Sequence, residues 1–198
     1  MATDQSRLKS IGTDVTIYDP VVLIRPELMV FNSHIIISEF AYLAAGLGLY
    51  LGNYIHISAH TSISGGGACV VEDFVAISAG VRLITGSEDP SGAGLNGPTI
   101  PSEYRSVYRS FVHLNRHVFL ATNVIVHPGV TIGEGAVIGS GSIVTRDVEP
   151  WTVNVGSPAK KTKDRPKDVI LGLQEKLTES KGEELTDFSQ ILAEIKSR

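Results

Sequence analysis

The chain has 198 residues, a formal net charge of −4 and a pI near 5.8, and 42% of its residues are hydrophobic. This length supports one domain with an appendage, and the lack of Lys- or Arg-rich blocks excludes nucleic acid as an expected partner. The chain starts without an apolar signal segment, and its longest apolar stretch, residues 41–51, is too short to span a bilayer. We therefore expect no insertion into membranes. Because Cys69 is the only cysteine, no disulfide can form within the chain, and we expect a cytoplasmic protein.

After a lead-in over residues 1–10, residues 11–150 contain apolar residues spaced six positions apart within groups of three. Groups of three such positions repeat every twenty residues, and after a break the six-residue spacing resumes. The members of this six-residue ladder are Ile11, Ile17, Leu23, Phe31, Ile37, Leu43, Leu51, Ile57, Ile63, Val71, Ile77, Leu83, and then Tyr108, Leu114, Leu120, Val126, Ile132, Ile138 and Val144.

Repetition at a fixed period is typical of a solenoid, in which each repeat buries its apolar side only against its neighbours. Three six-residue steps close a triangular coil, so the ladder predicts an all-β solenoid, a left-handed parallel β-helix over residues 11–150. Glycines three positions after a ladder residue, such as Gly135 and Gly141, suit tight corners because they tolerate positive φ. A right-handed β-helix and an all-β sandwich are the alternatives.

Two segments depart from this pattern. Residues 87–107 are rich in Gly, Pro and Ser, and a long loop inside a compact repeat is usually functional. Residues 151–198 form a C-terminal tail with helical stripes of apolar residues over 167–177 and 185–195. We expect these two helices to cap the open end of the solenoid, where unpaired strand edges would otherwise invite aggregation.

The hexapeptide repeats, the loop SEDPSG…LNGPTIP, the run HPGVTIGEGAVIGSGSIVTRDV and the tail WTVNVGSPAKK resemble the hexapeptide-repeat acyltransferase superfamily. The resemblance covers roughly residues 10–165 and is strongest to the sugar and nucleotide-sugar acetyltransferases of surface-polysaccharide biosynthesis. It implies a homotrimer with an active site at the subunit interface, acetyl-CoA as co-substrate and a small sugar as acceptor.

The resemblance also implies which residues lie near CoA. Arg146 and Lys160 are candidates for its phosphates, although both also fit the description of solvated surface charges. The full set near CoA is Ser142, Thr145, Arg146, Gly156, Ser157, Ala159 and Lys160.

Histidines are the first candidates for the base that acyl transfer requires. His56 and His113 each stand one position before a ladder residue, so we expect both to point outward on the same edge, two coils apart. The family's galactoside and maltose branch places its catalytic histidine in the loop after a Thr-Gly pair. Here Thr85-Gly86 is followed by no histidine before His113, so that base cannot be carried over.

The loop offers two adjacent carboxylates, Glu88 and Asp89, as further catalytic candidates. A carboxylate is a weak base for a sugar hydroxyl but is adequate for an amine, which attacks as the free base. We therefore expect N-acetylation of an amino sugar that is carried by a nucleotide. The alternative interpretation of Glu88 and Asp89 is a turn, which Asp-Pro favours. Arg105 and Arg109 are candidates either for a nucleotide diphosphate or for pairing with the loop acids.

Three other functions fit parts of the sequence. A sugar O-acetyltransferase would use a histidine base. A γ-carbonic-anhydrase-like zinc enzyme is suggested by His56-x3-His60 and His113-x3-His117, although a corner separates the members of each pair and we expect no metal. A non-catalytic trimeric scaffold would not bind CoA.

Overall fold

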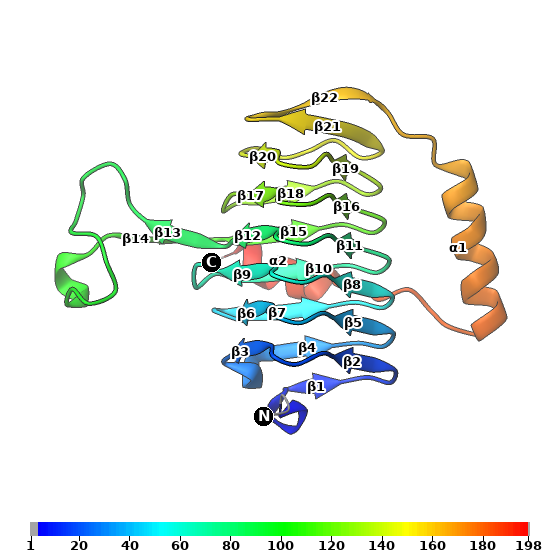
Figure 1. The fold of residues 1–198 in the computed structure, drawn as a ribbon, viewed down its shortest axis with the longest axis horizontal. Coiled ribbons are helices and arrows are strands. Elements are labelled where there is room, and N and C mark those ends of the chain that lie inside the picture. The colour runs from blue at the N-terminus through cyan, green and yellow to red at the C-terminus, as the bar shows by residue number, and fades with distance from the viewer. Residues whose placement is uncertain (1–3, 198) are drawn as a thin grey trace.

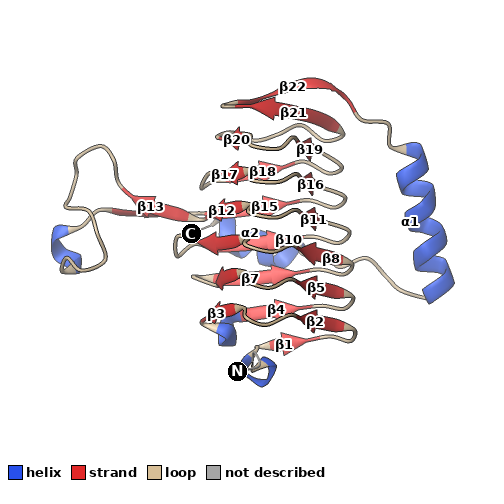
Figure 2. Ribbon diagram, in the orientation of Figure 1, coloured by secondary structure: helices blue, strands red, loops and turns tan. Residues whose placement is uncertain are grey.

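The structure, a computed structural model, describes residues 4–197 and is a left-handed parallel β-helix, as the six-residue ladder predicts. Each coil contributes one short strand to each of three sheets, and the helices lie outside the coils (Figures 1 and 2). Among the described residues, no helix is long and apolar enough to cross a membrane.

The strands of each sheet follow the coils in order. The first sheet contains β1 Ser10–Ile11, β4 Met29–Phe31, β7 Gly48–Leu51, β10 Ala68–Val71, β15 Phe111–Leu114 and β18 Val130–Ile132. The second contains β2 Val15–Ile17, β5 Ile35–Ile37, β8 Ile55–Ile57, β11 Ala76–Ile77, β16 Phe119–Leu120, β19 Val137–Ile138, β21 Thr152–Gly156 and β22 Ala159–Asp164. The third contains β3 Val22–Ile24, β6 Tyr42–Ala44, β9 Ser62–Ser64, β12 Arg82–Ile84, β17 Ile125–Val126 and β20 Ile143–Val144.

The elements outside the three sheets are a two-stranded hairpin, two α-helices and three short 3-10 helices. They are β13 Gly86–Glu88, β14 Val107–Arg109, α1 Asp168–Lys181, α2 Ser189–Lys196, η1 Gln5–Arg7, η2 Pro26–Leu28 and η3 Ser102–Tyr104.

Ladder residues fill the interior of the coils, because parallel pairing keeps equivalent positions in register. Phe31 pairs with Leu51 and Leu114 pairs with Ile132, and all four side chains are fully buried. Burying a side chain of this size contributes about 1.5–3 kcal/mol. Two ladder residues are exposed: Tyr108 is 53% exposed because its strand β14 pairs with β13 outside the coils, and Ile11, in the first coil, is 38% exposed.

Aromatic rings stack along the corner between the first and second sheets. His34, Tyr54, Phe74, His117 and Trp151 all have φ between 54° and 62°, so L residues as well as glycines take the left-handed corner conformation. Successive ring centroids lie 4.6, 5.1, 5.1 and 5.9 Å apart. Such contacts contribute roughly 0.5–1.5 kcal/mol each and offset the strain of the corners.

The prediction that the C-terminal helices cap the open end of the solenoid is wrong. The hairpin of β21 and β22 covers that end, with β21 pairing with β19. Helix α1 instead stands beside the coils, and its Gln174 Oε1 lies 2.6 Å from His117 Nε2 in the aromatic corner. Helix α2 lies against the first sheet, with Lys196 over the Phe111 ring. The apolar stripe of α1 is largely uncovered, since Val169 is 74% and Leu173 is 60% exposed.

The segment between the two helices, residues 182–188, is fastened to the coils by hydrogen bonds, and we call it the strap. The Thr186 amide and hydroxyl donate to the Asp73 carboxylate, both at 2.7 Å. Glu183 accepts a hydrogen bond from the Tyr54 hydroxyl at 2.5 Å and lies 3.0 Å from His34 Nε2. The strap therefore holds the chain between α1 and α2 on the middle coils.

Titration of the strap should make stability depend on pH. Hydrogen bonding to Asp14 and then to Glu183 raises the pKa of His34, so this contribution is complete below about pH 6.5 and is lost as the pH rises through the folded pKa. Hydrogen bonds from Tyr54 and then His34 lower the pKa of Glu183, so its contribution is complete above about pH 4.3 and is lost at lower pH. Replacing Glu183 with Gln should lower Tm by a few degrees between these pH values.

Thermal unfolding of the wild type and of Glu183→Gln across pH 3.5–8.5 measures this difference. It should shrink toward both ends of the range, whereas Glu184→Gln, at an exposed neighbouring position, should leave Tm unchanged. A Tm difference that does not vary with pH would contradict the assignment.

Candidate functional site

The inserted loop leaves the solenoid where the third sheet meets the first. It is anchored by Thr85, whose buried hydroxyl accepts from the Gly67 amide at 3.0 Å and donates to the Ser64 carbonyl at 2.9 Å. Beyond it, β13 and β14 pair antiparallel and project the loop away from the coils (Figure 1). A Cβ at Gly86 would lie 2.4 Å from the Gly65 carbonyl oxygen, so only glycine fits at the base of this hairpin.

Glu88 and Arg105 form an ion pair inside the loop. Of the two roles that the sequence allows for Arg105, the structure therefore shows pairing with a loop acid. Both side chains are largely buried, and the hydrogen bond from Arg105 lowers the pKa of Glu88. The pair joins the beginning of the loop to its end. Glu88 is therefore a structural carboxylate here, with its charge neutralised by Arg105.

Asp89 lies beside a cavity of 390 Å³ at the base of the loop. The lining is Ser87, Asp89, Pro90, Ser106, Val107 and Tyr108. The Asp89 carboxylate accepts from the Ser91 amide at 2.7 Å and from the Ser106 hydroxyl at 3.3 Å, and the first of these bonds lowers its pKa. Asp89 thus makes the turn expected at Asp-Pro and also presents an ionised carboxylate to the cavity.

The two candidate histidines lie on different sheets, and the prediction that they share one edge is wrong. His56 is in β8 of the second sheet, exposed, with Nε2 3.5 Å from the Ser38 hydroxyl. His113 is in β15 of the first sheet and is 4% exposed, with Nε2 2.7 Å from Glu72 Oε1. The prediction fails because β15 pairs directly with β10, so the chain returns from the inserted loop to the first sheet and His113 lies there. His113, covered and paired, is not available to a ligand from solvent.

The region expected near CoA gathers at the end of the solenoid beside the β21–β22 hairpin. Arg146, Ala159 and Lys160 line one cavity of 250 Å³, together with Asp147, Val148, Glu149, Asn154 and Lys161. Within residues 4–197, Arg146 and Lys160 have no ion-pair partner, whereas Lys161 pairs with Glu149 and Asp164.

The other residues of that set have different environments. Buried Ser142 accepts a hydrogen bond from the Gly156 amide at 3.0 Å, so it positions the hairpin and does not face solvent. Thr145, Gly156 and Ser157 are exposed next to it. The structure therefore brings the two unpaired cations together and gives Ser142 a structural contact.

No group of three or more His, Cys, Asp or Glu side chains in the described part of the chain is arranged to hold a metal ion. The pairs that suggested zinc are separated. His60 stacks on Phe40 with ring centroids 5.1 Å apart, away from His56, and His117 is part of the aromatic corner.

Tyr108 is a cavity residue that spacing alone assigns to the core. It stands six positions before Leu114, so the ladder predicts an inward side chain. The only sequence signal against this is its place at the end of the Gly- and Pro-rich loop.

Comparison with known proteins gives consistent similarities. Residues 111–146 match the family described as "Bacterial transferase hexapeptide (six repeats)". An Escherichia coli protein, dTDP-4-amino-4,6-dideoxy-D-glucose acyltransferase, is 35% identical over 163 residues, which are 82% of this chain and 85% of that protein.

Two solved structures of AntD, an N-acyltransferase from Bacillus cereus, are each 30% identical to this chain. One is a variant in complex with dTDP-4-amino-4,6-dideoxyglucose and coenzyme A, with a TM-score of 0.84 over 89% of this chain and 94% of AntD. The other is in complex with dTDP and 3-hydroxybutyryl-CoA, with a TM-score of 0.83 over the same shares of the two chains.

Proposed function

The chain belongs to the hexapeptide-repeat acyltransferases, and we propose that it transfers an acetyl group from acetyl-CoA to the amino group of a dTDP-linked 4-amino-4,6-dideoxyhexose. The relatives described above act on or bind this class of sugar. The observation in this chain that carries the proposal is the ionised Asp89 carboxylate at the loop cavity, a site suited to an amine.

An amine attacks as the free base, so it needs a hydrogen-bond acceptor that orients it and does not need a strong base; a carboxylate of low pKa can act as that acceptor. Asp89 accepts a hydrogen bond from the amino group and orients its lone pair toward the thioester carbonyl. The N–C bond forms, the C–S bond breaks, and the proton lost by nitrogen balances the charge on the departing thiolate. A hydroxyl acceptor would need a stronger base, because it must lose its proton before or during attack.

We place the CoA phosphates at Arg146 and Lys160. Both cations line the cavity beside the β21–β22 hairpin and lack carboxylate partners among the described residues, so an anionic group there gains charge-assisted hydrogen bonds. Thr145, Gly156, Ser157 and Ala159 border the same region.

The proposed assembly is a homotrimer, in the cytoplasm, with each active site shared by two copies. Helix α2 lies against the first sheet, whereas the second and third sheets expose apolar side chains, including Ile36, Phe119 and Tyr42. His56 is exposed on β8 of the second sheet, and Asp89 directly follows β13 in the loop that leaves the corner of the other two sheets. One site can contain both only if His56 comes from one copy and Asp89 from another. Cys69, a buried free thiol, fits a reducing compartment.

Release of free thiol from acetyl-CoA tests the reaction, with dTDP-linked 4-amino sugars compared with matched hydroxyl sugars. The wild type should release thiol only with the amino sugar, and 3-hydroxybutyryl-CoA in place of acetyl-CoA tests the donor. Asp89→Asn should lower kcat about a hundredfold, because the amide no longer accepts from the amine as a charged group does.

Glu103→Gln is the matched control, since Glu103 is an exposed carboxylate of the same loop outside the cavity. Thiol release with hydroxyl sugars alone, or full activity in Asp89→Asn, would overturn the proposed reaction.

Mixing two variants tests the shared site. His56→Asn and Asp89→Asn should each be slow alone, and co-refolded in equal amounts they should regain up to about a quarter of the wild-type rate, because one interface in four then has both native residues. A rate no higher than the mean of the separate variants would show that His56 of one copy and Asp89 of another do not share a site.

Neutral replacements test the CoA site. Arg146→Gln and Lys160→Gln should each raise KM for acetyl-CoA about tenfold while KM for the sugar is unchanged, since each removes a charge-assisted hydrogen bond. Lys163→Gln, on the same strand but outside the cavity, is the control. Equal KM values for acetyl-CoA in all four proteins would rule out these contacts.

A further inference from the structure

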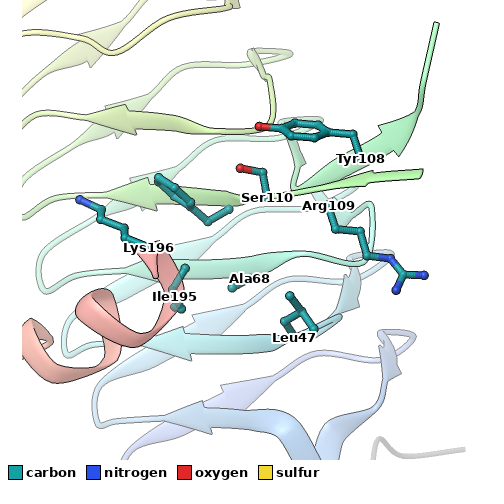
Figure 3. A pocket seen from close by; sticks show the side chains of 8 residues that line it. Leu47, Ala68, Tyr108, Arg109, Ser110, Ile195 and Lys196 are labelled. Carbon is teal, nitrogen blue, oxygen red and sulfur yellow. The ribbon is translucent and has the colours of Figure 1, made fainter. Parts of the chain in front are cut away.

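The position of Asp89 depends on contacts within the inserted loop. Every residue that lines the cavity beside Asp89 belongs to the loop or to the β13–β14 hairpin at its base. A second cavity, of 470 Å³, lies beside α2, where Tyr108, Phe111 and Ile195 help to line it (Figure 3). Tyr108 lines both cavities, so the hairpin has open space next to it where it leaves the coils. The coils therefore leave the geometry of this site to the loop itself.

The β13–β14 hairpin has two faces, because successive side chains of a strand point to opposite sides. Glu88 pairs with Val107 across the hairpin. Tyr108 and Asp89 are each one residue away from this pair, so they lie on the face opposite to Glu88. Figure 3 shows this alternation on β14, where Tyr108 and Arg109 extend in different directions.

An ion pair crosses the hairpin on the face of Glu88. Arg105 stands two residues before Val107, which places it diagonally across from Glu88, within reach of a long side chain. The Arg105 and Glu88 side chains are only 18% and 26% exposed, so water and salt screen their attraction less than that of a surface pair. Arg105 also bridges to Leu95, and the Gly97 backbone hydrogen-bonds to Glu88. The pair therefore joins the beginning, the middle and the end of the loop.

The hairpin offers Glu88 a second arginine at the same spacing. Arg109 stands two residues after Val107, on the same face, yet within residues 4–197 it has no carboxylate partner. Of the two arginines diagonal to Glu88, only Arg105, the one on the side of Asp89, forms the ion pair.

The next residues along the two strands, Asp89 and Ser106, are joined by two hydrogen bonds. The Asp89 amide donates to the Ser106 carbonyl at 2.9 Å, and the Ser106 hydroxyl donates to the Asp89 carboxylate at 3.3 Å. Asp89 directly follows Glu88, and Ser106 directly follows Arg105. The ion pair therefore fixes the residue before each partner, at the point where the pairing of β13 with β14 ends.

We propose that Arg105, through its ion pair with Glu88, is a positioning residue that keeps the Asp89 carboxylate directed at the amine of the acceptor. This inference rests on the proposed function. The pair lies on the opposite face of the hairpin from Asp89 and acts on the reaction through the backbone, by limiting how far Asp89 can move from Ser106. Such limits matter because a displacement of about 1 Å can slow a reaction about a hundredfold.

A double-mutant cycle tests this role, with Glu88→Gln, Arg105→Gln and the variant that carries both changes. Each single change should lower kcat about tenfold and leave KM for acetyl-CoA unchanged, because Asp89 loses its fixed position while the CoA site is untouched. The double variant should be no slower than either single variant, since the two residues act as one unit. Glu103→Gln, at an exposed carboxylate of the same loop, should keep the wild-type kcat.

Hydrogen exchange without substrate gives an independent readout. Both single variants should exchange faster than the wild type in peptides that cover residues 86–91 and 104–108, while the coils exchange as before. Arg109→Gln is the matched control for exchange, because Arg109 has the same spacing from Val107 without a carboxylate partner in the described part of the chain. It should exchange like the wild type.

Unchanged exchange in both single variants would overturn the positioning role, as would an unchanged kcat or additive losses of kcat in the double variant. Faster exchange throughout the coils would also overturn it, since it would show general destabilisation. If the wild type releases no thiol with the amino sugar, the proposed function fails, whereas the exchange comparison still decides whether the ion pair holds Asp89. The two failures therefore give different results.

Discussion

Parallel pairing between successive coils, in register, is the constraint on which the rest of this structure depends. A slip of one residue would turn the buried side of a strand outward, so each coil must return to the same register. The coils of the N-terminal half pair residues twenty apart, as Phe31 with Leu51, and later coils pair residues eighteen apart, as Leu114 with Ile132. Extra residues are therefore accommodated at a corner, and the long loop leaves from the corner that already takes two extra residues per coil.

The strap links the C-terminal part of the chain to the middle coils of the solenoid. Asp73 is 1% exposed and accepts hydrogen bonds from the Asn53 amide and from Thr186. Its neighbour Glu72 contacts buried His113 within the coils, whereas Asp73 takes two of its hydrogen bonds from Thr186 of the strap. A buried carboxylate without such partners would be strongly destabilising. This requirement explains why the strap lies across the middle coils and does not extend to the end of the solenoid.

The sequence predicts the solenoid well because the six-residue spacing of its apolar residues corresponds to one side of each triangular coil. It predicts the loop because residues 87–107 break that period, and it offers Glu88 and Asp89 without choosing between them, since the pairing of Glu88 with Arg105 exists only in the folded loop. It cannot assign His113 to a sheet, because the face on which the chain resumes depends on how the loop returns. Nor can it separate Arg105 from Arg109, since pairing with Glu88 is a property of the folded loop. The aromatic corner has a sequence signal, rings in equivalent positions of successive coils, but spacing of apolar residues alone does not reveal it.

The strap also determines where the end of the chain lies, because α2 and its Lys196 follow it directly. The last turn of α2 reaches the base of the loop only because Glu183 and Thr186 fix the chain that precedes it. The coils alone supply Ala68 and Phe111 to the cavity beside α2, and the loop supplies Tyr108 and Arg109. Helix α2 completes the cavity with Ile195 and Lys196, at a place where the solenoid itself presents small and apolar residues. The hydrogen bonds of the strap therefore have two consequences, since they cover polar groups of the middle coils and also position α2 beside Phe111.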